Sequence, residues 1–110
     1  MDTTTFSALA EPNRLHIVEL LRNGPLTVGE IADQVGIRQP QASKHLRVLL
    51  DAGLVDVRVV ANRRIYRLQQ EPFRELNEWL ETYKALWDER FDNLERYLKE
   101  LQAKDKPSKE

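Results

Sequence analysis

Residues 39–47 concentrate side chains that form directed hydrogen bonds or carry positive charge. They are Gln39, Gln41, Ser43, Lys44, His45 and Arg47. Glutamine can pair with adenine through a bidentate hydrogen bond, whereas lysine and arginine favour guanine or phosphate. The chemistry that this stretch offers is therefore recognition of base edges and phosphates. Solvation of an ordinary helix surface is the alternative for the polar side chains, and His45 could equally cap or pack its own helix.

A second basic group follows at residues 58–64. Arg58, Arg63 and Arg64 surround a predicted turn in which Asn62 tolerates a positive φ. A basic tip of this kind suits a phosphate backbone or a minor groove.

Positive charge is concentrated in the middle of a nearly neutral chain. The 110 residues have a formal net charge of −1. Residues 36–70 carry seven basic and two acidic side chains, a net charge of +5, and the segments on either side carry −3 each. A local positive potential attracts a polyanion even when the whole protein is slightly acidic.

The composition limits the classes to which this chain can belong. Its length, its 41% hydrophobic and its 32% charged content fit one globular domain. The absence of cysteine excludes disulfides, thiol redox sensing and thiolate metal sites. The sequence contains no Ser/His/Asp pattern and no glycine-rich phosphate loop, so we do not expect an enzyme. No apolar run approaches the ~20 residues that cross a bilayer, and no signal peptide is expected.

Periodicity and turn residues predict the elements that position these side chains. Helices are expected at residues 3–10, 13–22, 28–35 and 39–52, followed by a hairpin of strands that begin at Val55 and Arg64, and a long helix from Pro72. Thr27 and Glu30 have the spacing of a capping box, and Gly36 and Gly53 end helices. A tight helix pair makes its second helix protrude, and a protruding helix fits a major groove.

The last predicted helix carries more apolar surface than one small domain needs. Trp79, Leu86 and Tyr97 widen a stripe that repeats every three or four residues. An exposed stripe of this size favours dimerisation over packing within one chain. The residues predicted to join two copies are Phe6, Leu9, Leu76, Leu80, Tyr83, Trp87, Phe91, Leu94 and Leu98.

These elements predict a fold that is mostly α with a small β-hairpin, namely a winged helix-turn-helix with a long C-terminal dimerisation helix. DNA binding and dimerisation are assigned to one domain, residues 1–103, and residues 104–110 to a polar tail.

Several segments resemble ArsR/SmtB-type repressors. The opening segment, residues 6–15, contains Leu-Ala-Glu-Pro-Asn-Arg, which is similar to the family's frequent Leu-Ala-Asp-Pro-Thr-Arg. Residues 24–32 and 39–49 resemble the family's first tri-helical element and its recognition helix, and residues 52–55 lead into the hairpin as they do there. The resemblance implies a homodimeric winged-helix repressor of the bacterial cytoplasm that blocks transcription by occupying a palindromic operator, with autoregulation as one option.

The resemblance also implies a double-stranded DNA-binding surface. The positions that it carries over are Gln39, Gln41, Ser43, Lys44, His45, Arg47, Arg63 and Arg64. The full predicted DNA-binding set also includes Thr27, Arg38, Arg58 and Asn62. Arg38 stands where many members have serine, which alters the helix cap and offers an extra phosphate contact. Asn62 stands where glycine is common, which asparagine replaces at modest strain.

The usual metal sites of the family are not expected in this chain. Metal-responding members use cysteines on the first helix of the motif or His and Asp ligands on the last helix. Residues 26–32 have no thiol, and the last helix has no histidine. Asp88, Glu89 and Asp92 could hold a hard cation, but a solvated acidic patch is the preferred interpretation. No metal or cofactor is expected, and the identity of any effector stays open.

Two other interpretations stay open at this point. PadR-like and MarR-like winged-helix regulators also dimerise through a C-terminal helix, although the opening segment favours the ArsR type. The second is a protein-interaction module with weak non-specific DNA binding, which the basic middle of the chain disfavours.

Overall fold

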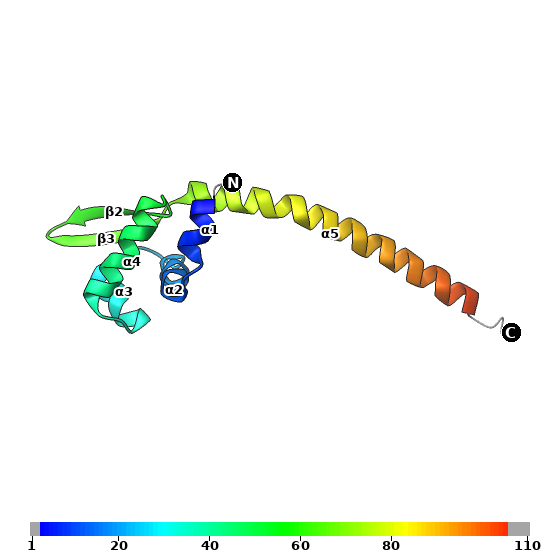
Figure 1. Ribbon diagram of the computed structural model, residues 1–110, viewed down its shortest axis with the longest axis horizontal. Helices are drawn as coiled ribbons and strands as arrows, with labels where there is room; N and C mark the ends of the chain where they lie inside the picture. The colour runs from blue at the N-terminus through cyan, green and yellow to red at the C-terminus, as the bar shows by residue number, and fades with distance from the viewer. Residues whose placement is uncertain (1–2, 106–110) are drawn as a thin grey trace. The chain divides into compact units, whose positions relative to one another are not determined.

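The computed structural model describes residues 3–105, and Figure 1 labels their helices and strands. In chain order these are α1 (Thr3–Leu9), α2 (Pro12–Leu21), β1 (Leu26–Thr27), α3 (Val28–Val35), α4 (Gln39–Asp51), β2 (Val55–Val60), β3 (Arg63–Leu68) and α5 (Gln70–Asp105). The chain forms two compact units, and the boundary between Glu75 and Leu76 falls within α5. The predicted architecture, mostly α with a hairpin wing and a long last helix, is confirmed.

The last helix is longer than predicted at both ends. It begins at Gln70 rather than Pro72, because a proline in the first turn removes no intrahelical hydrogen bond. It continues to Asp105, past the predicted domain boundary at residue 103. The rest of the predicted tail, residues 106–110, lies outside the described residues.

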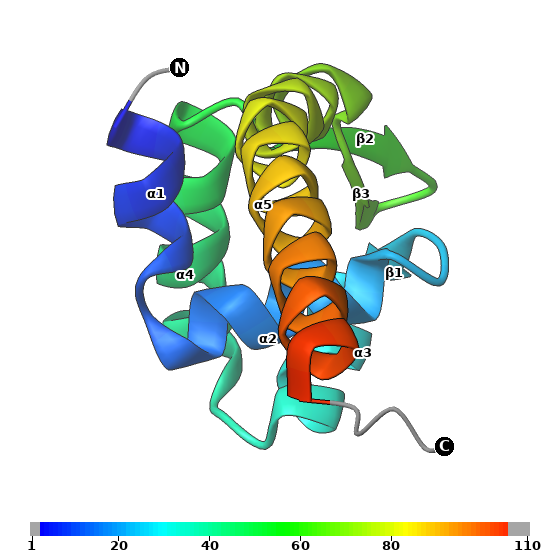
Figure 2. The ribbon, with the colours of Figure 1, turned by 90° about the vertical axis from the view of Figure 1, so that its right-hand side faces the viewer.

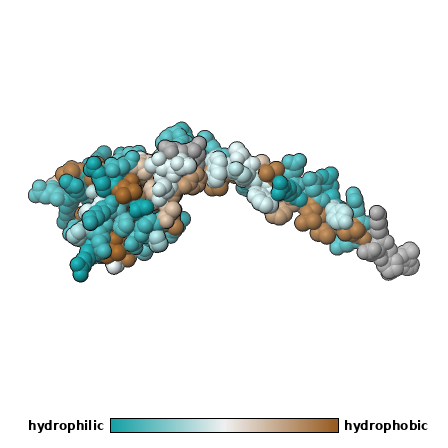
Figure 3. Space-filling view, viewed as in Figure 1, coloured by the Kyte–Doolittle hydropathy of each residue, from teal (hydrophilic) through white to brown (hydrophobic). Residues whose placement is uncertain are grey.

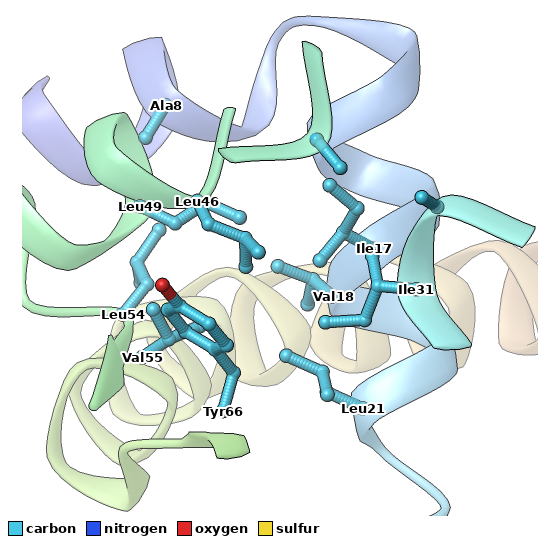
Figure 4. Packing of buried hydrophobic residues seen from close by; sticks show 12 residues of the cluster. Ala8, Ile17, Val18, Leu21, Ile31, Leu46, Leu49, Leu54, Val55 and Tyr66 are labelled. Carbon is cyan, nitrogen blue, oxygen red and sulfur yellow. The ribbon is translucent and has the colours of Figure 1, made fainter. Parts of the chain in front are cut away.

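A core of aliphatic side chains and one tyrosine holds the first unit together (Figure 4). Its residues are Ala8, Ile17, Val18, Leu21, Ile31, Ala32, Ala42, Leu46, Leu49, Leu54, Val55 and Tyr66. Ile17 of α2, Ile31 of α3 and Leu46 of α4 are each 0% exposed, so these three helices share one apolar centre. Burial of each such side chain stabilises the fold by about 1.5–3 kcal/mol.

Capping interactions fix where the helices of the first unit begin. The Thr27 Oγ1 accepts a hydrogen bond from the Glu30 N–H at 3.2 Å, and the Glu30 carboxylate accepts one from the Thr27 N–H at 2.9 Å. This is the predicted capping box of α3. Gly36 ends α3 with a φ of 82°, a left-handed conformation in which glycine is unstrained.

The junction between α1 and α2 is held by Glu11 and Arg14. The Glu11 carboxylate accepts a hydrogen bond from the Arg14 N–H at 2.9 Å and so caps α2. The Arg14 guanidinium donates to the Ala8 carbonyl at 2.6 Å, near the end of α1. Together these bonds give the Glu-Pro-Asn-Arg segment a structural role, because Glu11 caps the start of α2 and Arg14 caps the end of α1.

A three-stranded antiparallel sheet completes the first unit, with the strand order β1-β3-β2. Figure 1 shows β2 and β3 projecting beyond the helices of this unit as a hairpin, and Figure 2 shows β1 beside the end of β3. The short edge strand β1 was not predicted, because two residues are too few to show an alternating pattern. It pairs Leu26 with Tyr66 and Thr27 with Ile65. Because Thr27 also caps α3, β1 fixes the start of α3 beside the central strand of the sheet.

Both residues of the hairpin turn adopt positive φ. Ala61 has a φ of 48° and Asn62 a φ of 68°. This pattern matches a type I′ turn, whose backbone twist suits a two-residue hairpin connection. The prediction for Asn62 is confirmed, whereas nothing in the sequence indicated that Ala61 would share this conformation.

Candidate nucleic-acid interface

Helix α4 separates a buried side from an exposed polar side. Ala42, Leu46 and Leu49 are each 0% exposed and belong to the core. The exposed side of the helix carries five of the predicted contact residues, which are Gln39, Gln41, Ser43, Lys44 and Arg47. The structure therefore gives the recognition helix, as we call α4, a free surface of hydrogen-bonding and basic side chains near its N-terminal half.

Gln41 has a structural role within the recognition helix. Its side-chain oxygen accepts a hydrogen bond from the Arg38 N–H at 3.1 Å. Arg38 occupies the N-cap position, and its guanidinium has no acceptor with which to cap the helix. Gln41 therefore supplies half of a capping box from the third helical position, and a bidentate contact with a base would have to share its side-chain oxygen with this bond.

His45 contacts the N-cap residue of α2 as well as lying in the predicted binding segment. Its Nδ1 lies 3.6 Å from a Glu11 carboxylate oxygen, and its side chain is 21% exposed. The contact is an ion pair only when the imidazole is protonated. The packing role that the sequence left open for His45 thus has a defined partner, while its use in binding stays a prediction.

An open groove of about 570 Å³ joins α3, α4 and the hairpin. Its lining includes Val28, Gly29 and Glu30 together with five of the predicted site residues, which are Thr27, Gln39, Asn62, Arg63 and Arg64. Three separate stretches of the sequence therefore meet at one surface. Pairing between β1 and β3 brings them together, since β1 leads directly into α3 and β3 leads out of the turn.

The strand register distributes the wing arginines over both faces of the hairpin. Arg63 pairs with Val60 and Arg64 with Val59, while Arg58 pairs with Ile65. Directly opposed residues share a face and neighbours along a strand alternate, so Arg58 and Arg63 lie on one face and Arg64 on the other. A wing of this kind can meet phosphates on either side of its tip.

Two acidic residues of the first unit interact with arginines of β3. Hydrogen bonds from the backbone and then the side chain of Thr27 lower the pKa of Glu30, and the positive charge of Arg63 lowers it further. At the base of the hairpin, Asp56 accepts hydrogen bonds from Arg67 at 2.9 Å and from Gln69 at 2.8 Å. The hydrogen bond to Asp56 and the negative charge of that carboxylate raise the pKa of Arg67. The Arg67 guanidinium therefore already has an anionic partner within the protein.

Within residues 3–105, no group of three or more histidine or carboxylate side chains is arranged to hold a metal ion. In the same part of the chain, no helix combines the length and apolar character needed to span a membrane.

Comparison with known proteins places this arrangement in a family. A family model described as a helix-turn-helix domain matches residues 9–58. The HTH-type transcriptional regulator Rv2034 of Mycobacterium tuberculosis is 46% identical over 63 residues, which are 57% of this chain and 59% of that protein. Further curated relatives include a biofilm growth-associated repressor and an arsenical resistance operon repressor. The chain spans about two fifths to three fifths of the length of the first curated relatives that it matches.

Solved structures give the same result over more of the chain. The ArsR family transcriptional regulator RHA00566 is 31% identical, with a TM-score of 0.69, over 78% of this chain and 94% of that one. The homodimeric winged helix-turn-helix DNA-binding domain Mb0332 of Mycobacterium bovis is 31% identical, with a TM-score of 0.63, over 83% of this chain and 82% of that one. These matches favour the ArsR assignment over the PadR-like and MarR-like alternatives. The chain belongs to the ArsR family of winged helix-turn-helix transcriptional regulators.

Proposed function

We propose that this protein is a homodimeric repressor that binds a palindromic operator in duplex DNA. The observation that carries the proposal is the groove in which Gln39 of the recognition helix meets Thr27, Arg63 and Arg64. A base-reading helix and a basic wing on one continuous surface are what a winged helix needs to engage one stretch of duplex. The family assignment supports the same function.

In the proposed complex the recognition helix enters the major groove. Ser43 and Lys44 lie exposed in its N-terminal half, where side chains reach base edges. Gln41 would contribute while it caps the helix, and Arg47, which lies 3.3 Å from Asp51, would reach the backbone. Arg63 and Arg64 would neutralise phosphates or enter the adjacent minor groove.

Dimerisation is proposed to use the apolar stripe of the second unit. Helix α5 leaves large apolar side chains exposed along its length, visible in brown in Figure 3. Trp87 is 51% exposed and Phe91 is 60% exposed. Leu80, Tyr83, Trp87 and Phe91 line a shallow and mainly apolar hollow on this helix. Surface of this kind is normally covered, and the Mycobacterium bovis relative is described as homodimeric.

The predicted dimer residues of the first unit behave differently from one another. Phe6 is exposed, whereas Leu9 packs against the core. Phe6 therefore fits a role at an interface better than Leu9 does.

Repression would result from occupancy of the operator, which excludes the polymerase from a promoter. A two-fold dimer would place its recognition helices about 34 Å apart, one turn of the duplex. We propose that the protein acts in the cytoplasm, where a bacterial chromosome is accessible. The protein-interaction module is the competing function, with the exposed face of α5 as its supporting observation.

Selection of bound fragments from genomic DNA tests the proposal. We expect recovered sequences to share an inverted repeat, and we expect log K for the recovered site to fall linearly with log salt concentration. Binding that is insensitive to salt, or no recovered motif together with a monomeric mass, would favour the interaction module instead.

A further inference from the structure

Glu30 is the acidic residue in the wall of the groove that otherwise presents Gln39, Asn62, Arg63 and Arg64. We propose that Glu30 is an electrostatic brake on DNA binding: its carboxylate opposes the entry of phosphate beside the wing arginines and lowers the affinity for every duplex. This inference rests on the proposed function and adds to it a residue that sets affinity.

The position of the carboxylate is fixed by the capping box. Glu30 accepts the Thr27 N–H at 2.9 Å, and its own N–H donates to the Thr27 hydroxyl at 3.2 Å. The carboxylate also lies in the first turn of α3, where the helix dipole favours negative charge. It cannot turn away from an approaching phosphate without uncapping the helix, so the repulsion is built into the fold.

The same carboxylate acts on a wing arginine. Attraction between Arg63 and Glu30 contributes to keeping Glu30 ionised. A phosphate that binds Arg63 must therefore compete with a fixed negative charge that is already present. Charges several ångströms apart at a protein surface interact strongly enough to change affinity by about threefold to tenfold.

The negative charge of Glu30 is separable from its structural role. A capping box accepts glutamine as well as glutamate at this position, because either side-chain oxygen can accept the N-cap N–H. The variant Glu30→Gln therefore keeps the bond to Thr27 and removes only the charge. Glu19 is an exposed glutamate of α2 that does not line the groove, so Glu19→Gln is a matched control with the same change in net charge.

The experiment measures binding of the full chain to a random-sequence duplex of about 25 base pairs, which is long enough for two half-sites. We expect Glu30→Gln to bind about threefold to tenfold more tightly per subunit than wild type, with a salt slope steeper by about one per subunit. Glu19→Gln should change the affinity by about twofold or less, because it lies outside the groove. In an Arg63→Ala background, the gain from Glu30→Gln should shrink.

Several results would overturn the inference. Unchanged or weaker binding by Glu30→Gln would show that the carboxylate does not oppose phosphate, and an equal gain from Glu19→Gln would show a general charge effect. A melting temperature of Glu30→Gln that converges with that of wild type in acid, where Glu30 is uncharged, checks that the cap is retained. If wild type bound no duplex even at low salt, the proposed function itself would fail, and the inference would fall with it.

Discussion

His45 of the recognition helix and Glu11 of the α2 cap approach within 3.6 Å, between the Nδ1 atom and a carboxylate oxygen. Glu11 thus contacts two helices, since its carboxylate also accepts a hydrogen bond from the Arg14 N–H and so caps the start of α2. The position of the recognition helix is in this way linked to the segment that precedes α2.

Replacing Glu11 by alanine should destabilise the first unit. We expect Glu11→Ala to lower the free energy of unfolding by about 1–2 kcal/mol, because the helix loses its cap and α4 loses a contact. Urea denaturation measures this change. Glu19→Ala, at an exposed position on the same helix, is the control and should alter stability by less than about 0.5 kcal/mol. Equal losses in the two variants would contradict a capping role.

Ser43 and Arg64 should affect DNA binding in different ways. Ser43→Ala should weaken binding to the selected operator by about 1–3 kcal/mol and relax the preference at one base position. Arg64→Ala should weaken all sequences alike and reduce the salt slope by about one. Competition binding with operator and random duplexes distinguishes the two. Ser43 is a better test than Gln41, whose replacement would also remove the cap at Arg38.

Trp87 provides the test of the dimer. Its ring stacks against Phe91 with centroids 6.2 Å apart, and it is half exposed in the single chain. Trp87→Asp should yield monomers, because a charge would be buried at the proposed interface. Light scattering after gel filtration measures the mass. The variant Asp92→Asn, which changes a polar side chain on the same helix, should leave the mass of wild type unaltered.

Leu49 should be among the most sensitive positions of the core. It is 0% exposed and lies on the recognition helix. Leu49→Ala should reduce the free energy of unfolding by about 2–5 kcal/mol, since it removes buried apolar surface and leaves a cavity. Chemical denaturation tests this value. A loss below about 1 kcal/mol would mean that the core repacks around the missing atoms.

The pKa of Glu30 makes a prediction about acid. Because its pKa is lower in the folded chain than the ordinary value of 4.5, ionised Glu30 stabilises the fold above that pH. This contribution is lost as the pH falls through the lowered pKa. The melting temperature of wild type should therefore exceed that of Glu30→Gln at neutral pH and converge with it in acid. A difference that does not depend on pH would contradict the prediction.

Local rules predicted most of the fold from the sequence. Thr27 with Glu30 and the glycine at position 36 marked the ends of α3, and the alternating valines after Val55 marked the wing. These signals act over a few residues, so they can be read without knowing the tertiary structure.

The features that the sequence did not reveal depend on contacts between distant segments. Strand β1 exists because Leu26 and Thr27 meet Tyr66 and Ile65, some forty positions further along the chain. The groove, and the place of Glu30 within it, depend on that pairing. The partner of His45 was likewise hidden, because Glu11 lies far from it in sequence.

The pairing of β1 with β3 also has a mechanical consequence. The backbone at the start of α3 is paired with β3, the strand that leads away from the tip of the hairpin. This pairing couples the start of α3 to the hairpin through backbone hydrogen bonds. Any event that tilts the central strand will carry the threonine cap and the arginine tip together rather than spreading them apart.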